Sequence, residues 1–178
     1  MSGVRRVVAG VSGSPANLQA IRYAAMLARA HHAALIPVLA WLPPGGDFAD
    51  RSHPSRYLRQ LWQDAADKRL GQAIELAVGA IPVDLKCVPQ AVRGQPGAVL
   101  VRAAGREGDL LVVGTGRPGR LARLAACRVS RYCLAHAHCP VVAVPPSELA
   151  RLNRGLRGWA WRHRGLSRGE QAELRVSG

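Results

Sequence analysis

The 178-residue sequence has no apolar run near the roughly 18 residues that a membrane-spanning helix needs. Its first residues enter an apolar segment without the hydrophobic region and small-residue cleavage site of a secretory signal. Its four cysteines, at positions 87, 127, 133 and 139, are too sparse for a disulfide scaffold. These absences predict a protein of the reducing cytoplasm.

Acidic residues and lysine are also scarce. The chain has 11 acidic against 25 basic residues, and only two of the basic residues are lysine. The net charge of +14 divides into +10 for residues 1–145 and +4 for residues 146–178. An excess of arginine is typical of a protein with an anionic partner, but also of a chain encoded by a GC-rich genome. Both interpretations stay open at this point.

Short apolar runs alternate with amphipathic helical segments along the chain. The pattern predicts strands at 4–11, 33–41, 81–88, 109–114 and 139–144, and helices at 15–32, 55–79, 94–106 and 121–137. This alternation is typical of an α/β fold with a parallel sheet covered on both faces. Pro37 lies inside the second predicted strand, and because proline cannot donate to a strand ladder, we expect an edge-like or bulged strand there.

Ligands of such sheets bind beyond the carboxyl ends of the strands, where the strand order reverses. That rule points to residues 10–14 and 113–117. The glycine-rich segment 114–120 lies between a predicted strand and a predicted helix, so its backbone amides could surround a bound anion. An ordinary glycine-rich turn is the alternative, because the segment matches neither the dinucleotide-binding fingerprint nor a P-loop.

Five segments follow one another along the chain: the first strand and turn (7–14), Val-Arg-Gly-Gln-Pro (92–96), Asp-Leu-Leu-Val-Val-Gly-Thr (109–115), Val-Ser (129–130) and the last strand (139–144). In their order and spacing they resemble the universal stress protein family. The resemblance covers about residues 4–145. It implies an open, doubly wound, five-stranded parallel sheet in the order 3-2-1-4-5, as in the adenine nucleotide alpha hydrolase-like proteins. We therefore expect a domain at 1–146. The segment 147–178, which the resemblance does not cover, is a basic extension containing arginine and tryptophan.

The resemblance implies a nucleotide or phosphate site along the carboxyl edge of the sheet. ATP-binding members share the pattern G-x-x-G, nine residues, G-[ST], and an acidic residue after the first strand. Without gaps, this chain keeps Gly114 but has Arg117, Cys127 and Arg128 at the other three positions, and Ser12 at the acidic one. The candidate cofactor-binding residues are Gly10, Val11, Ser12, Ala40, Val113, Gly114, Gly116, Arg117, Gly119, Cys127 and Arg128.

Glycine lets the backbone come close to a phosphate, so these replacements predict that ordinary ATP binding is lost. Arginine is itself a phosphate ligand, so a nucleotide, ATP included, or another phosphate compound remains the alternative. We therefore expect a regulatory or binding module with a degenerate nucleotide site. An ATP-binding protein with slow hydrolysis is the second hypothesis. Whether the protein is an enzyme stays open, and no catalytic residue is assigned.

A polyanion-binding protein is the third hypothesis. The partner would be a nucleic acid or an anionic surface, bound through the five arginines between 117 and 131 and the arginine and tryptophan residues of 151–168. Solvated surfaces are the alternative for both segments. Cys133, His136, His138 and Cys139 resemble a metal-binding run, but they cross a predicted helix–strand junction that would scatter the side chains. No metal site is predicted.

The last strand, Val141, Val142, Ala143 and Val144, lies at the sheet edge in the order 3-2-1-4-5. An apolar edge strand without an internal charge or proline invites pairing with another chain. The resemblance implies a homodimer that pairs this strand with its symmetry mate. A monomer whose edge is covered by the carboxyl-terminal extension is the alternative.

Overall fold

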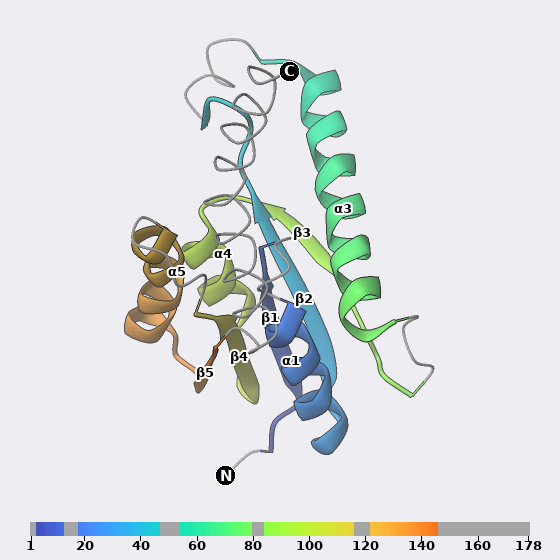
Figure 1. Cartoon of the computed structure of the whole chain (residues 1–178), viewed down its shortest axis with the longest axis vertical. Helices are drawn as coiled ribbons and strands as arrows, with labels where there is room; N and C mark the ends of the chain where they lie inside the picture. Colours follow the sequence, from blue (N-terminus) through green and yellow to red (C-terminus); the bar gives the residue numbers. More distant parts are fainter. Residues whose placement is uncertain (1–2, 13–17, 47–53, 80–83, 116–121, 146–178) are drawn as a thin grey trace, which may run out of the picture. The chain divides into compact units, whose positions relative to one another are not determined.

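A computed structural model of the chain describes residues 3–12, 18–46, 54–79, 84–115 and 122–145, with side chains from 128 onward in the last segment. Five parallel strands form one sheet in the order β3-β2-β1-β4-β5 (Figure 1). They are β1 (Arg6–Val11), β2 (Ala34–Trp41), β3 (Gln90–Arg93), β4 (Asp109–Gly114) and β5 (Val141–Val144). The predicted fold class and strand order are therefore confirmed.

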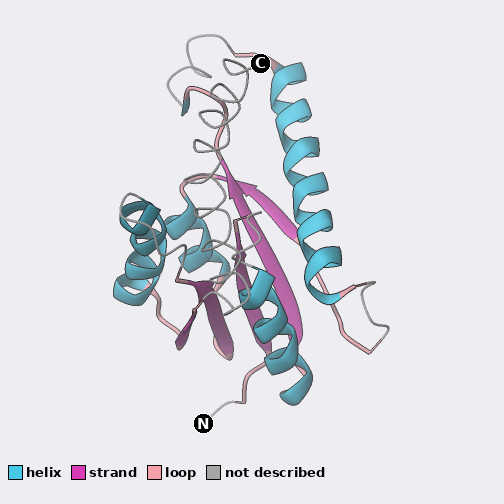
Figure 2. Ribbon diagram, viewed as in Figure 1, coloured by secondary structure: helices cyan, strands magenta, loops and turns pink. Residues whose placement is uncertain are grey.

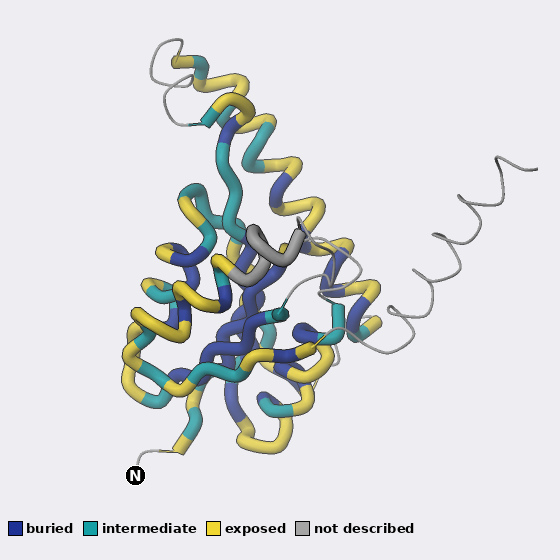
Figure 3. Tube along the Cα trace, turned by 60° about the vertical axis from the view of Figure 1, so that its left-hand side comes forward, coloured by how far each residue is buried: buried dark blue, intermediate teal, exposed yellow. Residues whose placement is uncertain are grey.

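Helices cover both faces of the sheet (Figure 2). They are α1 (Leu18–Ala30), α3 (Arg56–Val78), α4 (Pro96–Ala103) and α5 (Ala122–His136). Side chains alternate along β1, so that Val7 and Ala9 pack with the alanines of α1, while Val8 packs with α4 and α5. Val11 continues the first face toward α3. The three central strands, β2, β1 and β4, are buried on both sides, which explains their nearly continuous apolar sequences (Figure 3).

Pro37 lies in a strand, as expected, but the expectation of an edge-like strand was wrong. It is fully buried in β2, which lies between β1 and β3, and it pairs in register with Ala9. Two residues earlier, the Leu35 N–H donates to Lys86 O and the Leu35 carbonyl accepts from the Val88 N–H, both at 2.9 Å. Backbone groups alternate in direction along a strand, so the Pro37 nitrogen faces the same neighbour and offers it no hydrogen.

The third strand is also displaced from the predicted 81–88. Among the described residues of that segment, Cys87 forms only an isolated bridge to Leu35. Continuous pairing with β2 begins at Val38 and Gln90, just beyond Pro37. Because Pro37 withholds one donor from the ladder, the pairing is interrupted there and the regular strand starts later, at Gln90.

The amino ends of β1 and β4 are joined by an ion pair. Arg6 Nε lies 2.7 Å from Asp109 Oδ1, and an Arg6 guanidinium nitrogen lies 2.6 Å from Oδ2. The same carboxylate accepts the Arg106 N–H at 2.8 Å, while Arg6 also donates to the Ala103 carbonyl at 2.9 Å. The Asp109 side chain is 0% exposed, so the pair fixes β4 and the end of α4 against β1.

Candidate functional site

The sheet opens between β1 and β4 at its carboxyl edge. The pairing of β1 with β4 ends at Ala9 and Val112. The outer pairings continue further: β1 stays paired with β2 as far as Val11, and β4 stays paired with β5 as far as Gly114. The last two residues of β1 and of β4 therefore diverge where the strand order reverses, which is the position at which open α/β sheets bind ligands.

Gly10 is the first residue of β1 beyond its pairing with β4. A Cβ atom at Gly10 would lie 2.9 Å from a methyl carbon of Leu100 on α4 and 3.6 Å from Val113 Cγ1. Such a distance from Leu100 is shorter than real Cβ contacts, so the absence of a side chain lets α4 pack closely under the end of β1. In this position Gly10 serves helix packing.

The sheet brings several of the predicted site residues to one edge. Gly10 and Val11 end β1, Ala40 is the penultimate residue of β2, and Val113 and Gly114 end β4. Ser12 follows β1 and is exposed. Gly116, Arg117 and Gly119 lie outside the described residues, and of Cys127 only the place in α5 is described.

Ser130 of α5 also contacts this edge of the sheet, although it was not among the predicted site residues. Its side chain is buried, and its hydroxyl donates to the Gly114 carbonyl at 2.9 Å. Thr115, the residue after β4, is fixed to the end of β5, because its N–H donates to Val144 O at 2.9 Å. A serine in an otherwise apolar and arginine-rich helix was the available signal, since a buried hydroxyl needs a partner.

Arg128 is the first residue of α5 whose side chain is described, and it is exposed. It lines a cavity of about 390 Å³ with the first turn of α4, Pro96 and Gly97, and with Tyr132. A Cβ at Gly97 would lie 2.6 Å from the Tyr132 ring, so glycine lets the two helices approach. The guanidinium of Arg128 adds its positive charge beside the amino-terminal end of α4, where the helix dipole also places partial positive charge.

The cysteines do not form a reactive centre in the part of the chain that is described. Burial, with a smaller contribution from Cys139, raises the pKa of the Cys133 thiol to about 11. Burial also raises the pKa of Cys139 and of Cys87. Because the thiolate is the nucleophile and the metal ligand, these thiols are poorly suited to either role near neutral pH. Among the described residues, no three His, Cys, Asp or Glu side chains lie together to hold a metal ion.

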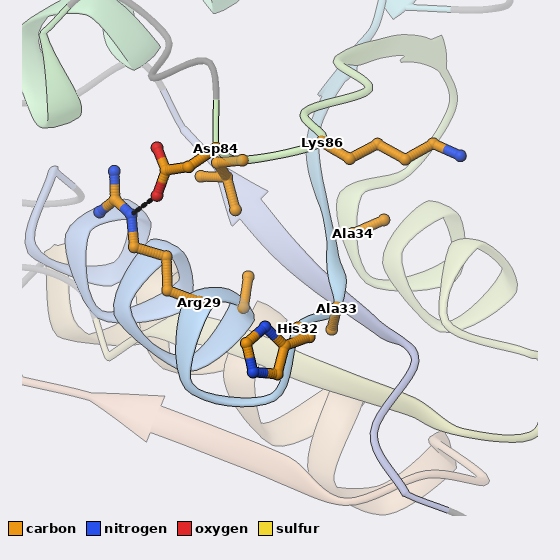
Figure 4. A pocket seen from close by; sticks show the side chains of 8 residues that line it. Arg29, His32, Ala33, Ala34, Asp84 and Lys86 are labelled. Carbon is orange, nitrogen blue, oxygen red and sulfur yellow. Dashed lines mark hydrogen bonds and ion pairs between the residues drawn. The ribbon is translucent and has the colours of Figure 1, made fainter.

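A second cavity, of about 360 Å³, lies at the opposite, amino end of the sheet (Figure 4). Arg29 and Asp84 form an exposed ion pair at 3.1 Å on one side of it, while the Lys86 side chain extends away from that pair. His32 adopts φ 50° at the end of α1, where the Ala33 N–H donates back to Ala28 O. This turn is a helix-terminating motif. The positive charges of Arg29 and Lys86 are also favourable near the carboxyl end of a helix.

None of the helices in the described ranges is both long enough and apolar enough to cross a membrane.

Comparison with known proteins identifies relatives of this domain. The universal stress protein Slr1101 of Synechocystis is 32% identical over 89 residues, which make up 49% of this chain and 82% of that protein. A universal stress protein solved in complex with cAMP is 28% identical, with a TM-score of 0.51 over 80% of this chain and 98% of that one. UspA from Lactobacillus plantarum shares the fold, with a TM-score of 0.57 at 19% identity over 81% of this chain and 99% of its own. Residues 3–145 match the universal stress protein family, and the chain belongs to that family.

Proposed function

We propose that this protein is a cytoplasmic binding module that takes a phosphate-containing ligand, of the nucleotide class, at the opening between β1 and β4. The observation that carries the proposal is the early end of the β1–β4 ladder at Ala9 and Val112. The opening lies where the strand order reverses, and the relative that is 28% identical was solved with cAMP. Both observations support a nucleotide-like ligand at this edge.

The proposed site differs from that of ATP-binding relatives in the groups it offers. Ser12 supplies a hydroxyl where the resemblance implies a carboxylate, and Arg128 supplies a guanidinium where it implies a small hydroxyl residue. Arg117 and Cys127 replace the two glycines between these positions. A guanidinium binds phosphate in a fixed, two-pronged geometry, whereas glycine admits the phosphate to the backbone, so the preferred ligand should change.

We therefore expect the dissociation constant for ATP to lie above about 0.1 mM, which corresponds to a binding free energy of less than about 5.5 kcal/mol. Isothermal titration calorimetry of the full chain with Mg-ATP measures this directly. A parallel titration with cAMP tests whether a ligand with one phosphate is preferred. Low-micromolar ATP binding would contradict the proposed change in the site.

We further propose a homodimer through the outer edge of β5. Leu111 N–H donates to Pro140 O and Thr115 N–H to Val144 O, so the backbone groups of the even-numbered residues of β5 face β4. Those of Val141 and Ala143 then point outward. At the other edge of the sheet, the Gln63 side chain donates to the Ala91 carbonyl at 3.1 Å and so occupies an acceptor of β3. This difference favours β5 as the pairing edge.

Antiparallel pairing about a two-fold axis would place Val142 against its own copy and pair Val141 of each protomer with Ala143 of the other. We expect Val142→Lys to convert the dimer into a monomer, because like charges would then meet at the axis. Ala143→Pro should weaken the dimer as well, since it removes an outward N–H without removing a bond to β4. Light scattering at micromolar concentration provides the masses.

The matched control is Val88→Lys, which adds a charge at a 40% exposed valine outside β5 and should leave the mass unchanged. A wild-type mass equal to the 19.0 kDa chain would refute the dimer. A dimer that persists in both β5 variants would instead place the interface elsewhere.

A further inference from the structure

The amino-terminal part of α3, residues 56–62, has no buried residue. The first buried side chain of the helix is Ala66, and from there a buried stripe runs through Leu70 and Ile74 to Ala77. Residues 56–62 are the teal end of α3 in Figure 1. We call this stretch the α3 projection.

The α3 projection is nevertheless held in a defined position. Ser55 caps the helix, its hydroxyl accepting the Leu58 N–H at 3.3 Å. At the other end Gln63 accepts a hydrogen bond from Trp41 Nε1 at 3.0 Å and donates to the Ala91 carbonyl at 3.1 Å. The carboxyl ends of β2 and β3 therefore anchor α3 at Gln63, and the residues before it extend past that anchor.

Large apolar side chains on the projection are exposed. Tyr57 is 75% exposed, Leu61 49% and Leu58 39%. Keeping such side chains in water has a cost that burial against an apolar phase would remove. Exposed apolar side chains gathered on one element mark an interaction surface.

The charges on the projection have one sign. Arg56 and Arg59 lie among the apolar residues, and residues 56–63 contain no acid. The next carboxylates, Asp64 and Asp67, accept side-chain hydrogen bonds from Gln60 and Gln63. The positive end of the helix dipole is at the same place. The surface is therefore complementary to an apolar phase that carries negative charge.

We propose that the α3 projection docks this protein on an anionic phospholipid surface. Leu58 and Leu61 enter the boundary between headgroups and acyl chains, Tyr57 lies at the headgroup level, and Arg56 pairs with lipid phosphates. A nucleic acid would satisfy the arginines but would leave the leucines in water. The net charge of +14 attracts the whole chain to the same surface.

The experiment is flotation of the full chain with vesicles of phosphatidylcholine alone or with one quarter phosphatidylglycerol. We expect binding to the anionic vesicles only, and a loss of at least about tenfold in the partition coefficient for the double variant Tyr57→Ser, Leu61→Ser, as expected when two large apolar groups stay in water. The matched control is Leu76→Ser, on the same helix and 67% exposed, which should bind like the wild type. Circular dichroism melting establishes that both variants fold.

Several results would overturn the proposal. One is equal binding of the wild type to neutral and anionic vesicles. Another is an equal fall of the partition coefficient in the double variant and in Leu76→Ser, and a third is an unchanged partition coefficient in the double variant. A changed mass of the double variant in light scattering would assign the projection to protein assembly instead. A loss of oligonucleotide binding in the double variant, with vesicle binding unchanged, would assign it to nucleic acid. None of these outcomes depends on whether a nucleotide binds between β1 and β4.

Discussion

Asp109→Ala is expected to lower the free energy of unfolding by about 2–4 kcal/mol, because it leaves a largely buried guanidinium without its partner. The Asp109 side chain is 0% exposed and that of Arg6 is 19% exposed, and two charged hydrogen bonds of 2.6 and 2.7 Å join them. The variant also loses the acceptor of the Arg106 N–H. Urea denaturation of the wild type and the variant measures the difference.

The matched control is Asp84→Ala. Asp84 and Arg29 also form an ion pair, at 3.1 Å, but their side chains are 64% and 42% exposed. Exposed pairs contribute roughly 0–1 kcal/mol, so this variant should be nearly as stable as the wild type. Equal losses in the two variants would show that burial does not determine the strength of the Asp109 pair.

The Asp109 pair also predicts how stability depends on pH. Burial by itself would raise the pKa of the Asp109 carboxyl, but the hydrogen bonds from Arg6 and from the Arg106 N–H, with the two positive charges, hold that pKa below its ordinary value. The stabilisation is therefore present above about pH 3.9, the pKa of an unfolded aspartate, and is lost as the pH falls through the lower pKa of the folded state. Asp109→Asn should remove this acid-side loss of stability, and an unchanged slope between wild type and variant would contradict the assignment.

The second large effect concerns the ligand site. The triple variant Arg117→Gly, Cys127→Gly, Arg128→Ser is expected to bind ATP at least about tenfold more tightly than the wild type, a gain of about 1.4 kcal/mol. The two glycines restore access of the backbone to a phosphate, and serine restores the small hydroxyl group. Calorimetry with Mg-ATP compares the two proteins.

Arg131→Ser is the control, because Arg131 is an exposed arginine of the same helix. It removes one arginine, as Arg128→Ser does, but restores no glycine, so its ATP affinity should equal that of the wild type. Glycine is a poorer helix former than cysteine, so Cys127→Gly weakens α5 and melting curves must accompany the titrations. A triple variant that folds but gains no affinity would show that backbone access does not limit ATP binding.

The sheet could be predicted from sequence because its central strands are buried on both faces. The short, continuous apolar runs that contain β1 and β4 indicate buried strands. The order of the strands in the sheet follows from the family resemblance. The third strand was misplaced because the effect of Pro37 falls on its neighbour. Residues 81–88 alternate as a strand would, but regular pairing with β2 resumes only beyond the position where Pro37 lacks a hydrogen.

The candidate site could be predicted only in part. The carboxyl-edge residues follow from topology, since parallel strands end at one edge. The hydrogen bond from Ser130 to the Gly114 carbonyl depends on the rotation of α5 against β4, which spacing along the chain does not determine. The same holds for Gln63, whose amide reaches both Trp41 and Ala91 from a separate helix.

The central claim is that the opening between β1 and β4 takes a phosphate-containing ligand but not ATP at ordinary affinity. Native mass spectrometry of gently purified protein tests it most directly, because tightly bound nucleotides survive such purification and are identified by mass. We expect protein without stoichiometric ATP. ATP retained at one molecule per 19.0 kDa chain would contradict it.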